Sequence, residues 1–299
     1  MRFSTLLLEA LSLSTLSSAL SIKRQAAATQ VYKFSSSPIQ VEGIAARSNG
    51  QLIVSFFDGS DIYTIDPTSK KATKIGSLTG ATCSAAITEV SPDIFAVVAG
   101  KYSGGRNTAG SWAVWKLDFT QATPKITQVK QVPESGMWNG ITTLNNDTVL
   151  VGDALKGAVF KLSISTGEYS IAIQDTTMAP PSGMPMGIDG VRYNNGTLYY
   201  TNIFKNSFYK VPIDATTAKT SGAVTPIWTN IQGDDMAFAP DGSIYVATNG
   251  KITKVGVDGK AATFASVAGA TAAVIGRGEG DKNKLYVSQN NGGVSSLTI

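Results

Sequence analysis

Short strand-like runs separated by turn residues repeat six times along this 299-residue chain, which leaves few architectures open. In the first copy, the runs cover residues 41–45, 51–55 and 61–66, and Asn49-Gly50 supplies a tight turn. The first strands of successive copies start near residues 42, 85, 139, 189, 235 and 272. The copies are therefore about 43, 54, 50, 46 and 37 residues apart, the size of a four-stranded propeller blade.

We therefore predict an all-β fold, a six-bladed β-propeller with four-stranded antiparallel blades, formed as one domain by residues 30–299. Residues 31–34 can supply the outer strand of the last blade, which closes the ring and removes a sheet edge. A large β-sandwich is the alternative, but it would not explain why the copies begin with acidic or amide residues.

The first 24 residues have the pattern of a secretory leader. Arg2 precedes an apolar stretch at residues 6–20, which is interrupted by Glu9 and too short to span a bilayer. Lys23-Arg24 forms a dibasic processing site. We expect residues 1–24 to direct the chain into the secretory pathway, to the outside or to a compartment on that route; a disordered amphipathic tail is the alternative.

Two sequons agree with this route, because Asn146 and Asn195 each lie two residues before a threonine with no intervening proline. We expect both to be glycosylation sites in tight turns. The apolar stretch is too short to give a membrane span.

Composition excludes several classes of function. The chain has no histidine, so a Ser–His–Asp triad, a Cys–His pair and an imidazole zinc site are ruled out. One cysteine, Cys83, excludes an intramolecular disulfide; with no basic neighbour, it is expected to be a small buried residue. The net charge of +4 is spread without a basic run, so no nucleic-acid partner is expected.

The starts of the inner strands carry the candidate site, since in a propeller they surround one mouth of the central channel. The residues placed at comparable heights are Glu42, Ala85, Asn139, Asp189, Asp235 and Ala272. Four of the six offer oxygen atoms, which suit Ca²⁺, another divalent cation or a polar ligand. The alternative is that each caps a turn or satisfies a buried backbone N–H.

Apolar and basic side chains are expected around the same mouth, where they would contact a mainly apolar small molecule. The predicted substrate-binding residues are Tyr102, Arg106, Met137, Trp138, Met184, Met186 and Arg277. Blade packing is the alternative for these side chains, and it is the expectation for Trp112 and Trp115. Arg277 can also pair with Glu279 or remain a solvated surface residue.

At Glu42, Asn139-Gly140 and Asp189-Gly190 the chain resembles the gluconolactonase and senescence-marker-type propellers. The resemblance implies a divalent metal held by Glu42, Asn139 and either Asp189 or Asp235, and a lactonase activity. The proline and tryptophan that follow the glutamate in that family are absent here.

The chain more closely resembles a group of secreted fungal propellers, in phrases at residues 41–52, 92–100, 110–116 and 187–190. Its characterised members are hetero-Diels–Alderases of tropolone sesquiterpenoid (meroterpenoid) biosynthesis, which join a quinone-methide-like tropolone to a cyclic terpene such as humulene. The resemblance implies a cofactor-independent pericyclase of secondary metabolism, active on small hydrophobic and oxygenated molecules.

Three hypotheses follow. In the first, a pericyclase orients two reactants, and Glu42, Asn139, Asp189 and Asp235 form its catalytic centre. The second is a metal-dependent lactonase, and the third is a non-catalytic ligand-binding propeller. A monomer is expected in each case.

Overall fold

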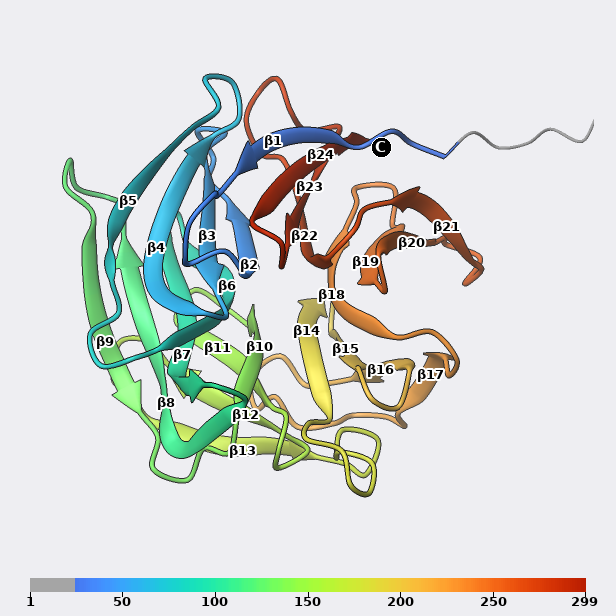
Figure 1. The fold of residues 1–299 in the computed structure, drawn as a ribbon. Helices are drawn as coiled ribbons and strands as arrows, with labels where there is room; N and C mark the ends of the chain where they lie inside the picture. Colours follow the sequence, from blue (N-terminus) through green and yellow to red (C-terminus); the bar gives the residue numbers. More distant parts are fainter. Residues whose placement is uncertain (1–24) are drawn as a thin grey trace, which may run out of the picture.

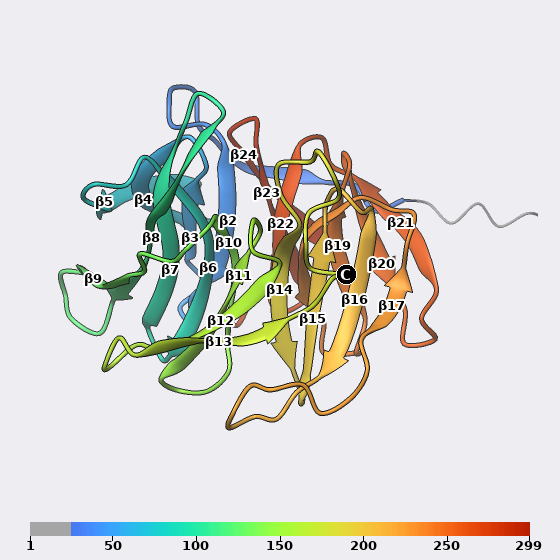
Figure 2. The same ribbon diagram turned by 90° about the horizontal axis from the view of Figure 1, so that it is seen from below.

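The computed structural model describes residues 25–299 and has six four-stranded antiparallel sheets arranged as a ring. The predicted six-bladed β-propeller is confirmed, and the β-sandwich alternative is wrong. Figure 1 looks along the ring axis, with one inner strand of each blade beside the centre, and Figure 2 shows the ring from the side. The leader predicted at residues 1–24 lies outside the described residues. Residues 25–299 contain no helix, so none there can cross a membrane.

The first three blades follow each other along the chain. Blade one comprises β2 (Val41–Ala46), β3 (Leu52–Phe56), β4 (Gly59–Asp66) and β5 (Lys71–Ser77). Blade two comprises β6 (Cys83–Ser91), β7 (Ile94–Ser103), β8 (Arg106–Asp118) and β9 (Lys125–Gln131). Blade three comprises β10 (Trp138–Thr143), β11 (Thr148–Asp153), β12 (Ala158–Ser163) and β13 (Tyr169–Gln174).

The remaining blades complete the circle. Blade four comprises β14 (Ile188–Asn194), β15 (Thr197–Asn202), β16 (Ser207–Pro212) and β17 (Thr225–Trp228). Blade five comprises β18 (Gly233–Phe238), β19 (Ile244–Thr248), β20 (Lys251–Val255) and β21 (Ala261–Ser266). Blade six comprises β22 (Ala270–Ile275), β23 (Lys284–Gln289), β24 (Gly293–Thr298) and, from the other end of the chain, β1 (Thr29–Lys33).

The ring closes where β1 pairs with β24, as the sequence predicted. Just after β1, Phe34 is buried against Phe56 and Tyr63 of blade one, with ring centroids 4.9 and 5.2 Å away. The closing segment thus pairs with blade six by backbone hydrogen bonds and packs on blade one through an aromatic cluster.

The apolar faces of neighbouring blades bury one another, which accounts for the alternating pattern of the strands. Cys83, Trp112 and Trp138 lie fully buried in one such cluster between blades two and three. The prediction that Cys83 is a buried residue is confirmed, and burial raises the pKa of its thiol further from a reactive value. Trp115 packs between blades one and two, as expected.

Each inner strand contains a β-bulge near its start, where two of its residues oppose one residue of the next strand. A bulge adds a residue to one strand and redirects its side chain. The second bulge position is glycine in three blades. A Cβ atom at Gly43, Gly140 or Gly190 would come within 2.3–2.4 Å of a carbonyl oxygen of the next blade. The blades therefore meet backbone to backbone at this level of the channel.

Hydroxyl groups of the second strands join neighbouring blades at the same level. The side chain of Ser55 donates to the Ala85 carbonyl, Thr201 donates to the Asp234 carbonyl at 2.6 Å, and Ser288 donates to the Glu42 carbonyl at 2.8 Å. These bonds satisfy carbonyls that the bulges release from sheet pairing, and they fix the height of each inner strand.

Candidate functional site

The first bulge position of each inner strand places one residue at the same level of the channel. Register assigns Glu42, Ala85, Asn139, Asp189, Asp234 and Thr271 to these six positions. The sequence-based alignment was therefore one residue out in blades five and six, where it chose Asp235 and Ala272. The two consecutive aspartates of β18 concealed Asp234, because either one can be aligned with the single acceptor of another blade.

The acceptor side chains converge, as expected, on one small chamber. Glu42, Asn139, Asp189, Asp234 and Asp235 line a cavity of about 10 Å³, enough for one water-sized group. Asn139 and Asp189 are buried, while Glu42 and Asp234 are partly exposed. We name this space the carboxyl chamber. A ligand larger than one atom or two must lie across its opening.

Asp235, at the second bulge position, has a different role from its neighbours. Its carboxylate forms an ion pair with Arg192 of β14, and one of its oxygens accepts from the Met236 N–H at 2.8 Å. Arg192 also donates to the carbonyls of Met236 at 3.1 Å and of Ile141 at 2.9 Å. Asp235 is thus committed to holding three blades together, and Asp234 is the residue whose carboxylate is available in the chamber.

Electrostatics favour the neutral form of the chamber carboxyls. Removal from water, together with the charges of Asp189 and Asp235, raises the pKa of Glu42 to about 8. Burial and the charge of Asp235 raise the pKa of Asp189 to about 7, although a hydrogen bond from Asn139 opposes this shift. The pKa of Asp234 is raised well above its ordinary value by burial and by the nearby carboxylates. Carboxyls that keep their protons near neutral pH can donate hydrogen bonds.

A divalent metal fits this chamber in chemical type, although several of the side chains are hydrogen-bonded or ion-paired as they stand. Carboxylate and amide oxygens suit a hard cation. Within residues 25–299, however, no three acidic, cysteine or histidine side chains lie close enough together to hold an ion. Asn139 directs its amide nitrogen at Asp189, and Arg192 already neutralises Asp235. Glu42, Asn139 and Asp189, one of the ligand sets implied by the lactonase resemblance, nevertheless line the same chamber.

Apolar groups lie on the chamber side of the ring in loops from blades one to four. Tyr102, on the extended β7–β8 hairpin, packs against Phe57 with ring centroids 4.8 Å apart. Met137 directly precedes β10 and is buried, whereas Met186 lies two residues before β14 and is partly exposed. Both belong to or pack on the same cluster. Phe57 belongs to this rim but was not predicted, because its turn carries no motif.

The other predicted substrate contacts differ in exposure. Trp138 is completely buried and packs against Phe160, with ring centroids 5.3 Å apart, so its indole offers no surface to a ligand. Arg106 is exposed at the tip of the β7–β8 hairpin. Met184 is 48% exposed in the loop before β14.

Arg277 is at the wrong end of the channel for the predicted role. It follows the C-terminal end of β22, whereas the chamber lies at the N-terminal ends of the inner strands. Its guanidinium pairs with Glu89 of β6, not with Glu279, and donates to the Ala46 carbonyl at 3.2 Å. The sequence repeat did not show at which end of the inner strand, and so at which end of the channel, Arg277 lies.

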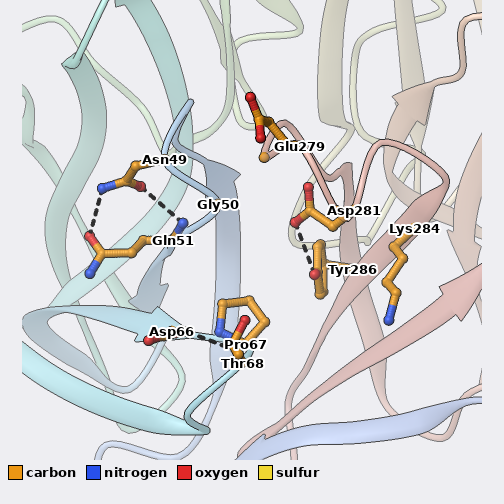
Figure 3. A pocket seen from close by; sticks show the side chains of 12 residues that line it. Asn49, Gly50, Gln51, Asp66, Pro67, Thr68, Glu279, Asp281, Lys284 and Tyr286 are labelled. Carbon is orange, nitrogen blue, oxygen red and sulfur yellow. Dashed lines mark hydrogen bonds between the residues drawn. The ribbon is translucent and has the colours of Figure 1, made fainter.

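One of the larger hollows lies away from the axis and is mainly polar. This hollow of about 530 Å³ separates blades one and six, where Asn49, Asp66, Glu279 and Asp281 face it (Figure 3). Asp281 accepts from the Tyr286 hydroxyl at 3.0 Å, and its other oxygen has no partner within residues 25–299. This hollow has little apolar surface for a terpene, so the axial chamber remains the better candidate site.

Comparisons with known proteins agree with this description. No protein-family model matches the chain. A Phoma sp. protein named "Putative hetero-Diels-Alderase" is 27% identical over 84% of this chain and 83% of its own length.

Among solved structures, the calcium-binding protein regucalcin from Agrobacterium tumefaciens superposes with a TM-score of 0.66 at 14% identity, covering 87% of this chain and 90% of its own. Virginiamycin B lyase from Staphylococcus aureus gives 0.59 at 13% identity, covering 91% and 99%. A luciferin-regenerating enzyme gives 0.67 at 16% identity, covering 92% and 95%. At these identities the likeness shows the fold alone.

Proposed function

We propose that this protein is a hetero-Diels–Alderase that joins a quinone-methide-type tropolone to a cyclic sesquiterpene without a bound cofactor. The similarity to the Phoma protein along most of both chains supports the reaction class. The leader-like first 24 residues support a place in the secretory pathway. Asn146 and Asn195 are exposed in turns, as glycan acceptors must be.

The observation that carries the proposal is the carboxyl chamber, which joins proton-bearing acids to an apolar rim. At neutral pH Glu42, with a pKa of about 8, donates a hydrogen bond to an oxygen atom seated in the opening. The chamber admits only that atom, so the rest of the tropolone would lie outside it, toward Phe57, Tyr102 and Met186 in the loops on the same side of the ring.

The reaction needs no net proton transfer. The heterodiene O=C–C=C and the terpene C=C exchange three π bonds for one new C–O bond, one new C–C bond and one remaining π bond, and every atom is retained. A hydrogen bond to the diene oxygen draws electron density from the diene and stabilises the developing charge. The acid keeps its proton throughout.

Orientation supplies the larger part of the acceleration. Holding two reactants in a near-attack arrangement can lower the barrier by about 7–11 kcal/mol. Methionine and aromatic side chains adapt to an irregular hydrocarbon, and they exclude water that would add to a quinone methide.

The test is a cycloaddition assay in which the purified protein meets humulene and a tropolone quinone methide released in solution. We expect a faster reaction with one stereoisomer in excess. Glu42→Ala removes the donor and should lower the rate about 10²-fold. Glu279→Ala removes an exposed carboxylate on the blade flank and should leave the rate unchanged.

A product mixture identical to the uncatalysed reaction would contradict the proposal. Chelator-sensitive hydrolysis of a lactone by the same preparation would replace it with the lactonase hypothesis.

A further inference from the structure

The end of the channel opposite the carboxyl chamber opens as a funnel of about 270 Å³. It lies where the inner strands end, and blades one, two, four, five and six contribute to its wall. Its accessible apolar wall comes from the partly exposed side chains of Phe238, Val274 and Ile275. We name this space the arginine funnel, for the two guanidinium groups described next.

Arg192 separates the arginine funnel from the carboxyl chamber. It lines the funnel, while its ion-pair partner Asp235 lines the chamber. Four of its five N–H groups are bound, to three carbonyls and to Asp235, which leaves one Nη2 hydrogen without an acceptor among residues 25–299. The buried end of the funnel is therefore a fixed cation.

Arg277 provides a second cation at the rim. Its Nη1 atom donates to the Ala46 carbonyl and to Glu89. Its Nε and Nη2 atoms, which carry three N–H groups, have no acceptor in the described part of the chain. Each of the two guanidinium groups is ion-paired, Arg192 with Asp235 and Arg277 with Glu89, so the funnel offers an anion unused N–H groups and not a net charge.

We propose that the arginine funnel is a second ligand site, for an apolar molecule that bears one carboxylate. The hydrocarbon part would cover the apolar wall, and the carboxylate would accept from the unused N–H groups of Arg277. These unused guanidinium N–H groups would form charge-assisted hydrogen bonds with the carboxylate. The carboxyl chamber has room for only one water-sized group and would not admit the same ligand, so the two ends of the channel select different chemistry.

Calorimetric titration with decanoate tests the site on the whole protein. We expect saturable binding to one site, and decanol, which lacks the charge, should bind more weakly. Arg277→Gln removes the free donors and should weaken decanoate binding about 3- to 10-fold, because the group is partly exposed. Lys282→Gln, the loss of an exposed charge on the adjacent loop, should leave the affinity unchanged.

Two further variants separate the ligand site from general surface charge. Val274→Phe fills the half-exposed wall and should abolish binding while the melting temperature stays near that of the wild type. Arg277→Gln combined with Glu89→Gln removes the repulsion left by an unpaired Glu89, and binding should stay weak. Equal decanoate affinity in wild type, Arg277→Gln and Val274→Phe would overturn the proposal, as would full recovery in the double variant. None of these readouts depends on cycloaddition.

Discussion

Two adjacent aspartates of β18 show how one residue of offset changes a chemical role. Asp234 faces the carboxyl chamber, whereas Asp235 forms an ion pair with Arg192. The raised pKa values of Glu42, Asp189 and Asp234 arise from packing several acids into one small space with little water. A cluster of this kind costs folding free energy, as functional sites often do.

That cost gives the protein a pH dependence of stability. Glu42 and Asp189 titrate near pH 8 and 7 when folded but near 4.5 and 3.8 in their ordinary state. From about pH 4 to 8 the folded protein therefore holds more protons than the unfolded chain, and its stability falls as the pH rises. We expect the unfolding free energy to drop by on the order of 6 kcal/mol between pH 5 and pH 8, with the larger share from Glu42.

Urea titrations across this range measure the slope. Glu42→Gln should flatten it and stabilise the protein at pH 8, whereas Glu279→Gln should reproduce the wild-type slope. A wild-type stability that is constant or rises from pH 5 to pH 8 would show that the acids are ionised in the folded protein.

The acceptors of three blades could be predicted from sequence because Glu42, Asn139 and Asp189 are each followed by glycine. The same rule fails in β18, where Asp235 occupies the position of that glycine. Another feature identifies the acceptors better. Each stands two residues before the apolar residue at which pairing resumes after the bulge, which is Ile44, Ile141, Val191 or Met236. The partners of Arg192 and Arg277 could not be predicted, since they come from blades distant in sequence.

At the scale of the element, the bulge in each inner strand is the feature that places the site residues at the axis. It directs one side chain to the axis and brings the following residue against the next blade. Glycine is needed at the second position because the neighbouring carbonyl occupies the space of a Cβ atom. Asp235 and Arg192 show the other solution, in which a larger side chain bridges the blades.

We expect Gly140→Ala to be severely destabilising. Its Cβ would lie 2.3 Å from the Asp189 carbonyl oxygen and 2.7 Å from the Val191 nitrogen, and backbone atoms cannot move aside without separating blades three and four. The expected loss is about 3 kcal/mol. Gly280→Ala is the matched control, because a Cβ there meets no atom within 4 Å. Equal urea midpoints for the two variants would contradict this description of the blade contacts.

At the scale of the whole molecule, the repeat length and the terminal strand were enough to predict the ring. Strand β1 pairs with β24 as expected, because an unpaired edge on the last blade would leave backbone groups unsatisfied. The opposite chemistry of the two channel ends was not predicted, since it depends on which side chains face the axis beyond the bulges. Neither the carboxyl chamber nor the arginine funnel corresponds to a continuous motif.

Ring closure should contribute measurably to stability through Phe34. Phe34→Ala removes a buried ring that contacts Tyr32, Phe56 and Tyr63, and we expect a loss of about 3 kcal/mol. Ile171→Ala, on an outer strand and 49% exposed, should change stability much less. Chemical denaturation of both variants makes the comparison; equal losses would mean that the closing segment adds no more than a surface residue.

The proposed chemistry depends on a protonated Glu42 that donates a hydrogen bond to the substrate and keeps its proton. The decisive measurement is the rate of stereoselective cycloaddition between pH 6 and pH 9.5 for wild type and Glu42→Gln. The wild-type rate should fall as the pH passes about 8, where Glu42 ionises, and the glutamine variant, which keeps an N–H donor at every pH, should show no fall in this range. A wild-type rate that rises with pH, or the same fall in both proteins, would contradict the account.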